Sequence, residues 1–297
     1  MPDQNLASDA IVDQLAALAD LPGIRDRADA VREACTRLRF HEALRRRIPE
    51  AAAESRVRGA RASAVLDGVD YPVDLVRELT TGARPWPDDL SPDLATLKGA
   101  IAASAESERV ASIVRTAPLQ ALARLHVAAA SPFVRAGDTD HTDTLGRPRV
   151  AGEDTSEFVD LGPAPDAAEV SRRLAQLADL IVAASKATNR VPAVVISSIV
   201  HGEVIAIRPF AHGNGLVARA LERALIQALG LDPTGVAVPE AGHVANGAVT
   251  YTGSSAAYGK GTAAGVGLWL GQAADAVLKG VAEGERICDA VRAGRLG

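Results

Sequence analysis

The residues best suited to chemistry lie in one short segment, Ile207-Arg-Pro-Phe-Ala-His-Gly-Asn-Gly-Leu-Val-Ala-Arg219. Gly213, Asn214 and Gly215 predict a tight turn, because glycine and asparagine tolerate positive φ. A turn of this kind leading into a helix leaves backbone N–H groups at the positive end of the helix dipole. The segment therefore predicts an anion-binding turn. The alternative is an ordinary helix corner that uses glycine for close packing.

Charged side chains flank this turn. Arg208 and Arg219 could add charge-assisted contacts to phosphate oxygens. His212 could act as a general base, since its reference pKa of about 6.5 suits that role, or it could be a solvated loop residue. The following helix is expected to begin at about Leu216. His201, on the helix before the turn, is expected to have no function and to face either the core or the hairpin-like flap expected over residues 131–166.

Two motifs resemble those of the Fic (Fido-domain) family. The main family signature is His-Pro-Phe-x-(Asp/Glu)-Gly-Asn-Gly-(Arg/Lys)-x-x-Arg, and this chain matches it at Pro209, Phe210, Gly213, Asn214, Gly215 and Arg219. Upstream, Ser63-Ala-Val-Leu-Asp67-Gly68 is similar to the family's inhibitory pattern, (Ser/Thr)-x-x-x-Glu-(Gly/Asn). The motifs occur in the expected order, and the resemblance covers about residues 55–280.

The resemblance implies an all-α, Fido-type fold with a small β-hairpin flap. It also implies transfer of AMP from ATP to a hydroxyl of an unknown target protein. The matching residues would bind the nucleotide: Phe210, Gly213, Asn214, Gly215 and Arg219. The upstream motif would inhibit through Ser63, Asp67 and Gly68, with the acidic residue paired to Arg219.

Three departures fall on the family's catalytic positions. Arg208 replaces the histidine, and a guanidinium stays protonated and cannot be a general base. His212 replaces the acid that holds Mg²⁺, an ion that prefers oxygen ligands. Leu216 replaces the first arginine. Loss of the base alone costs about 10²–10⁴ in rate. Either ATP or another nucleotide is bound without Mg²⁺, with His212 as a displaced base, or the chain is a pseudoenzyme that acts as an interaction module.

Asp67 also has two interpretations. Its carboxylate could form a partly buried ion pair with Arg219. Aspartate is one methylene shorter than the family's glutamate, so a water could bridge the pair. Alternatively, Asp67 is only the polar end of a helix before Gly68.

Composition and patterning favour helices to position these residues. Aromatic residues make up only 3% of the 297 residues, and alanine, leucine and arginine are abundant. Helices are expected over residues 9–20, 26–63 with a break at Pro49, 101–130, 167–184 and 194–206. A proline-rich loop is expected over 81–93 and a hairpin-like flap over 131–166. We divide the chain into an N-terminal helical extension (1–54), a Fido-like domain (55–280) and a C-terminal tail (281–297).

Charge and composition also exclude several classes of partner. A net charge of −5 disfavours a nucleic-acid coat or a polybasic membrane binder. Two cysteines cannot form a disulfide framework or a zinc site by themselves, and no metal site is expected. The N-terminus lacks signal-peptide features, so a cytoplasmic location is expected.

Some features leave the question of partners open. Residues 25–61 carry 11 arginines against 6 acids, which predicts either a solvated helix face or a docking surface for an acidic partner. Alanine-rich helices would allow a homo-oligomer. A polar cluster in the flap could bind a cation or be a hydrophilic loop tip; it comprises Asp138, Asp140, His141 and Asp143.

Overall fold

The computed structural model describes residues 2–134 and 142–295, and these residues form α-helices and short 3-10 turns with no β-strand. The all-α class is confirmed, but the β-hairpin flap is wrong. Residues 142–166, which we call the flap, form turns and one 3-10 helix, Val159–Leu161. Pro148, Pro163 and Pro165 supply no N–H for a strand ladder. Asp138, Asp140 and His141 of the polar cluster lie outside the described residues.

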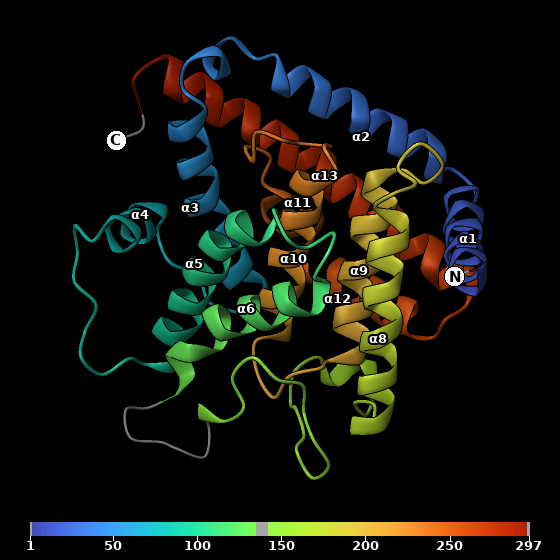
Figure 1. Ribbon diagram of the computed structural model, residues 1–297. Helices are drawn as coiled ribbons and strands as arrows, with labels where there is room; N and C mark the ends of the chain where they lie inside the picture. The colour runs from blue at the N-terminus through green and yellow to red at the C-terminus, as the bar shows by residue number, and fades with distance from the viewer. Residues whose placement is uncertain (1, 135–141, 296–297) are drawn as a thin grey trace.

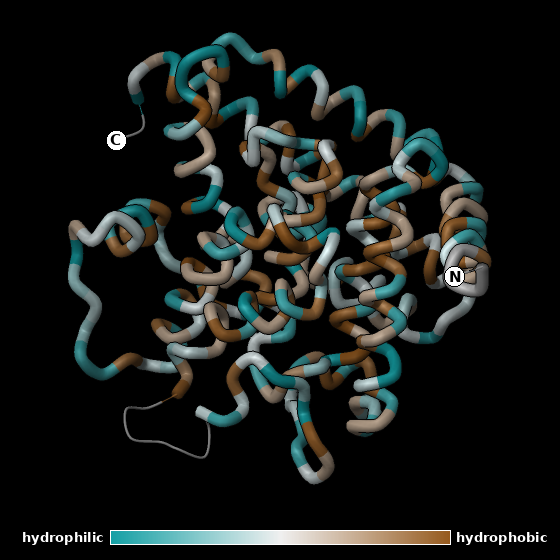
Figure 2. The backbone as a smooth tube through the Cα atoms, viewed as in Figure 1, coloured by the Kyte–Doolittle hydropathy of each residue, from teal (hydrophilic) through white to brown (hydrophobic). Residues whose placement is uncertain are grey.

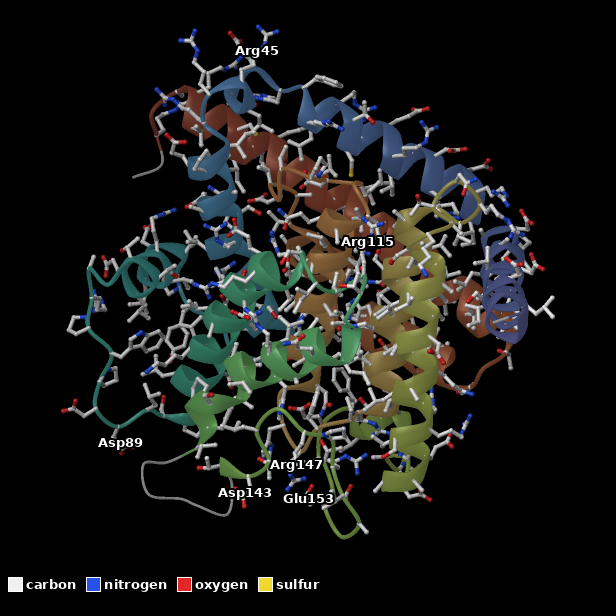
Figure 3. All side chains as sticks on the ribbon, in the orientation of Figure 1. Arg45, Asp89, Arg115, Asp143, Arg147 and Glu153 are labelled. Carbon is white, nitrogen blue, oxygen red and sulfur yellow. The ribbon has the colours of Figure 1, made fainter. Side chains whose placement is uncertain are left out.

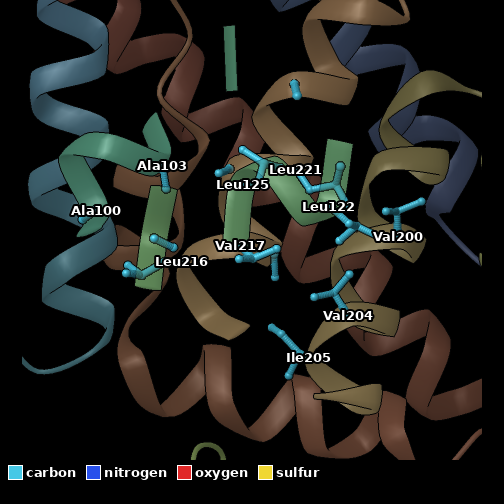
Figure 4. Packing of buried hydrophobic residues seen from close by; sticks show 14 of the residues in the cluster. Ala100, Ala103, Leu122, Leu125, Val200, Val204, Ile205, Leu216, Val217 and Leu221 are labelled. Atoms are coloured by element: carbon cyan, nitrogen blue, oxygen red, sulfur yellow. The ribbon is translucent and has the colours of Figure 1, made fainter. Parts of the chain in front are cut away.

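Two buried helices, α9 (Ala193–Ile207) and α10 (Asn214–Ala228), pack against each other at the centre of the molecule (Figure 1). Every residue from Val194 to Gly202 in α9 is buried. A helix that is apolar on all faces needs neighbours on all sides, so α9 must lie inside the fold. Figure 4 shows Val200 and Val204 of α9 beside Val217 and Leu221 of α10 in the apolar core.

Helices from the first half of the chain cover one side of α10 (Figure 1). These are α3 (Ile48–Leu66), α5 (Pro92–Val110) and α6 (Pro118–Ala130). The short helix α4 (Val73–Thr81) packs on α3 at the edge. On the other side, α8 (Ala167–Ala184) packs on α9, and α1 (Pro2–Ala19) packs on α8.

The longest helix, α13 (Ala263–Arg292), closes the back of the fold. It packs against α2 (Ile24–Arg39), α9, α11 (Pro239–Asn246) and α12 (Ala248–Gly259). A Cβ added at Gly242 of α11 would lie 1.7 Å from the carbonyl oxygen of Ala276, so only glycine permits this approach of α11 to α13. We expected boundaries between parts of the chain after residues 54 and 280, and these positions lie inside α3 and α13. No helix in the described ranges is long and apolar enough to cross a bilayer.

Prolines lie in the first turn of a helix at three places where the sequence pattern suggested otherwise. Pro49 lies in the first turn of α3, where proline costs no helical hydrogen bond. The chain between α2 and α3 instead contains a 3-10 turn, η1 (Glu42–Arg45). Pro92 begins α5 inside the expected loop, with Ser91 as its N-cap. Pro118 begins α6 and divides the expected 101–130 helix into two.

Hydropathy follows this arrangement, with apolar residues concentrated inside and polar residues on the outer helices (Figure 2). Arg45, in the arginine-rich N-terminal region, is exposed at the periphery (Figure 3). Other arginines of that region pair with acids: Arg25 with Asp20, Arg32 with Asp29, Arg56 with Glu108, Arg58 with Glu54 and Glu283, and Arg61 with Asp70.

Candidate functional site

The turn between α9 and α10 is held in shape by its own asparagine. Asn214 Oδ1 accepts a hydrogen bond from the Phe210 N–H at 2.9 Å, and Asn214 Nδ2 donates to the Phe210 carbonyl at 2.8 Å. Gly213, the N-cap of α10, adopts φ 81°, which glycine reaches without strain. α10 therefore begins at Asn214, two residues before the expected start at Leu216.

A carboxylate from the flap occupies the positive end of α10. Glu157 accepts hydrogen bonds from the Gly213 N–H at 2.5 Å, the Asn214 N–H at 2.8 Å and Asn214 Nδ2 at 2.8 Å. These donors form a cradle for an anion, as expected for a helix N-terminus. The anion in that cradle is a side chain of the same protein, so a phosphate can enter only after Glu157 leaves.

Opposing effects act on the pKa of Glu157 in this contact. Burial and the nearby Asp67 carboxylate raise the pKa of Glu157, while the hydrogen bonds from Asn214 and Gly213 lower it and compensate only in part. The hydrogen bonds thus favour the ionised carboxylate, whereas burial and the charge of Asp67 disfavour it. Glu157 and Asp67 thus bring two carboxylates to the turn and to Arg219, and the charge of Asp67 raises the pKa of Glu157.

Arg208 does not point to the cradle; its guanidinium is bound to the flap. The residue is 3% exposed, and the guanidinium donates to the carbonyls of Phe158 at 3.2 Å, Gly162 at 2.9 Å and Pro163 at 2.9 Å. Its backbone has φ 46° at the end of α9. Arg208, at the family's histidine position, therefore has a structural role, because its hydrogen bonds attach the flap to the α9–α10 turn.

A second buried arginine strengthens this attachment from the opposite direction. Arg149, in the flap, donates from Nε to the Arg208 carbonyl at 2.9 Å and from its terminal nitrogens to the carbonyls of Glu153 and Pro165. Its backbone N–H also donates to the Pro209 carbonyl at 2.7 Å. Near the surface, Arg147 pairs with Glu153 at 2.7 Å (Figure 3).

The rings around the turn are packed, not open. Phe210 is buried and stacks on His126 of α6 at 3.8 Å between ring centroids. Burial, the largest effect, lowers the pKa of His126 to about 4, and its Nδ1 accepts the Gly146 N–H at 2.9 Å. His212 is exposed, with its ring 6.3 Å from that of Phe133. His212 is thus the accessible one of these histidines, on the rim of the turn.

Arg219 is fully buried and forms the ion pair expected with Asp67, by a direct contact at 2.8 Å. It also donates from Nε to Ser63 Oγ at 2.7 Å and from a terminal nitrogen to the Ser63 carbonyl at 3.1 Å. Asp67 is at the same time the C-cap of α3, before Gly68 at φ 87°. A Cβ at Gly215 would lie 3.0 Å from both Arg219 and Asp67, so glycine leaves room for the pair.

His201 is buried, as expected, but it belongs to a polar network within the core. The network contains Glu222 of α10, His243 of α11 and Tyr251 of α12. Tyr251 lies 3.4 Å from Arg219, so the network reaches the buried arginine that pairs with Asp67. Burial, the largest effect, lowers the pKa of His201, which favours a neutral imidazole near neutral pH.

Sequence reasoning missed four of these residues: Glu157, Arg149, Glu222 and His243. Glu157 stood in an expected hairpin strand, and nothing in a local pattern shows that a flap side chain reaches a helix N-terminus. Glu222 and His243 lie 21 residues apart on different helices, so no helical spacing connects them. What distinguishes Glu222 and His243 is that they are polar residues at buried positions of α10 and α11.

The overall fold is similar to those of solved Fic structures. A Fic family protein from Desulfovibrio desulfuricans G20 matches with a TM-score of 0.67 and 23% identity, over 88% of this chain and 74% of that chain. Fic-1 from C. elegans matches with a TM-score of 0.63 and 15% identity, over 99% and 84%. A variant of Fic-1 matches with a TM-score of 0.61 and 15% identity, over 91% and 73%.

These similarities establish a Fic-like helical fold over most of the chain. No family model matches the sequence, and no curated protein matches it. The activity therefore has to be argued from the site itself.

Proposed function

We propose that this protein is a Fic-fold nucleotide- or phosphate-recognition protein whose site is held closed by two of its own carboxylates. The observation that carries the proposal is the position of Glu157. Its carboxylate accepts hydrogen bonds from the Gly213 and Asn214 amides, which supports the proposal that these donors can hold an oxyanion. A phosphate oxygen needs the same donors, so phosphate and Glu157 compete for one place.

Arg219 is the second element of the proposed phosphate site. It is already charged, buried and aimed at Asp67, and a phosphate oxygen could replace that carboxylate. Asp67 would then limit how the nucleotide is placed. ATP or another nucleotide thus fits the donor set only when Glu157 withdraws. Mg²⁺ does not fit the family position, because His212 offers nitrogen where that ion prefers oxygen.

We infer that ordinary AMP transfer is not the activity of this site. Arg208 cannot accept a proton from a target hydroxyl, and its guanidinium is engaged with flap carbonyls. His212 is exposed at the turn and is the candidate base there. The proposal is therefore recognition of a phosphate-bearing ligand, with transferase chemistry only if His212 serves.

The attachment of the flap to the α9–α10 turn also supports a second candidate function. Arg208 and Arg149 hold the flap over the turn through backbone carbonyls, as suits a permanently closed module that binds a protein through the flap. In that case the chain is a pseudoenzyme and the cradle never takes a ligand.

Calorimetric titration of inorganic phosphate and of ATP, with and without Mg²⁺, separates the two candidates. The comparison uses wild type, Glu157→Ala and Glu153→Ala. Glu153→Ala is the matched control, because it removes a flap carboxylate that pairs with Arg147 outside the cradle. In wild type, phosphate has to displace the Glu157 carboxylate from three N–H donors, whereas in Glu157→Ala that carboxylate is absent. This difference favours phosphate binding to the variant by about 2 kcal/mol, or about 30-fold.

We expect Glu157→Ala to bind ATP about 30-fold tighter than wild type and Glu153→Ala to behave as wild type. Adding Arg219→Ala to Glu157→Ala should weaken binding again, and Mg²⁺ should change it little. If folded Glu157→Ala binds neither phosphate nor ATP, the recognition proposal is lost and the interaction module remains. Incubation of Asp67→Ala with labelled ATP, with and without His212→Ala, decides whether His212 supports self-labelling.

A further inference from the structure

Three helices bring a set of metal-ligating side chains together below the turn: His201 from α9, Glu222 from α10 and His243 from α11. His201 Nδ1 lies 2.8 Å from Glu222 Oε2, and His243 Nε2 lies 2.9 Å from the same oxygen. All three side chains are 0% exposed, and their ligand atoms lie within 4.8 Å of one another. Ligands bound at about 2.0–2.2 Å to one ion stand about 2.8–3.6 Å apart, so the two histidine–glutamate spacings fit a shared ion.

The second ring nitrogen of each histidine also has a polar neighbour. His201 Nε2 lies 2.9 Å from the Tyr251 hydroxyl, and His243 Nδ1 lies 3.1 Å from the Gln272 amide. A histidine that binds a metal through one nitrogen usually donates its other N–H to such a partner, which fixes the ring. The Gln272 amide, turned about its terminal bond, would present its oxygen to His243. That rotation would give a partner to Gln272 Oε1, which lacks one among the described residues.

An unpartnered carboxylate oxygen provides an independent indication. Glu222 Oε1 is fully buried and has no hydrogen-bond partner within the part of the chain that the structure describes. Such an oxygen is costly, since a buried polar atom loses water without replacement. A cation bound by both oxygens of the carboxylate removes this cost. The second oxygen would also complete a four-coordinate set with the two imidazoles.

We propose that His201, Glu222 and His243 form a closed structural site for a divalent transition-metal ion, with Zn²⁺ as the ion that best suits two nitrogens and a carboxylate. Mg²⁺ and Ca²⁺ prefer all-oxygen ligands and do not suit this set. Full burial makes the site structural, because no position is open to substrate. The ion joins α9, α10 and α11, and through His201 and Tyr251 it fixes the environment of Arg219. This inference is independent of the proposed phosphate recognition.

Metal content of the full chain tests the site. Wild type, Glu222→Gln and Glu240→Gln are produced in Zn²⁺-supplemented medium, passed through a column with EDTA and analysed by plasma mass spectrometry. Glu240→Gln is the matched control, since Glu240 is an equally buried glutamate that pairs with Arg223 at 2.8 Å. We expect about one Zn²⁺ per chain in wild type and in Glu240→Gln, and a loss of at least ten-fold in Glu222→Gln.

A measurement on wild type alone keeps the proposal testable if Glu222→Gln does not fold. Wild type is unfolded in denaturant with EDTA and refolded with either Zn²⁺ or EDTA. Zn²⁺ should raise the unfolding midpoint, because an ion that binds only the folded state stabilises it. A metal-free wild type whose midpoint is the same with Zn²⁺ and with EDTA would overturn the proposal. Equal Zn²⁺ content in wild type and folded Glu222→Gln would overturn it as well.

Discussion

Arg208→His restores the residue type of the family's catalytic base, yet we expect it to damage the protein instead of activating it. The backbone is not the obstacle, because histidine tolerates the φ of 46° better than most residues. The side chain is the obstacle. An imidazole cannot span the carbonyls of Phe158, Gly162 and Pro163, which the guanidinium reaches at 2.9–3.2 Å.

The expected cost follows from these contacts. A hydrogen bond from a charged donor contributes about 1.5–3 kcal/mol, and three are lost. Part of this cost is offset because the freed flap carbonyls can reach water and a buried charge is removed. We therefore expect a loss of about 2–4 kcal/mol in the free energy of unfolding, with the flap opening first. Restored basicity should not give AMP transfer, since Glu157 and the missing acid still prevent it.

Denaturant unfolding and incubation with labelled ATP test both parts of this prediction. Arg172→His is the control, because Arg172 lies on the exposed face of α8 and contacts nearby Glu169 and Gln176. It should change stability by less than about 0.5 kcal/mol. An Arg208→His variant as stable as wild type that also labels itself with AMP would refute the structural role of Arg208.

Further expectations concern pH and packing. The pKa of His126 is lowered to about 4 from about 6.5 when unfolded. Its contribution to stability is thus present above about pH 6.5 and is lost as pH falls through about 4, a change of about 3 kcal/mol. His126→Gln should lack that part of the pH dependence of the free energy of unfolding; an unchanged profile would contradict the assignment. Gly242→Ala should destabilise by about 3 kcal/mol or more, since its Cβ would overlap the Ala276 carbonyl. Gly253→Ala in α12, where no described atom comes within 4 Å of the added Cβ, should instead gain about 0.5–1 kcal/mol. Thermal unfolding of the two variants would contradict the packing argument if both lost stability equally.

The predictable parts of this protein depend on local chemistry. The turn at Gly213 and Asn214 and the helix after it follow from backbone preferences, and the Asp67–Arg219 pair is implied by the resemblance of two motifs to those of the Fic family. Pro49 was misjudged because proline both ends and begins helices, and neighbouring residues do not decide which. The hairpin was wrong because the flap satisfies its carbonyls with the guanidinium groups of Arg208 and Arg149.

The unpredictable parts depend on contacts between distant segments. Glu157 meets Gly213 across 56 residues of chain, and its docking depends on where the arginines place the flap. The pattern that identified an anion cradle could not say which anion would occupy it. His201 was expected to be silent because its partners, Glu222 and His243, come from helices that only the fold brings together.

In the proposed site, Glu157 stands where a phosphate would bind. Crystal structures of wild type and Glu157→Ala, grown with phosphate or ATP, would show what occupies this place. We predict the Glu157 carboxylate on the Gly213 and Asn214 amides in wild type, and a phosphate oxygen on the same amides in the variant. A variant whose amides are covered by other side chains, or a wild type that binds phosphate there with Glu157 still in place, would contradict the account.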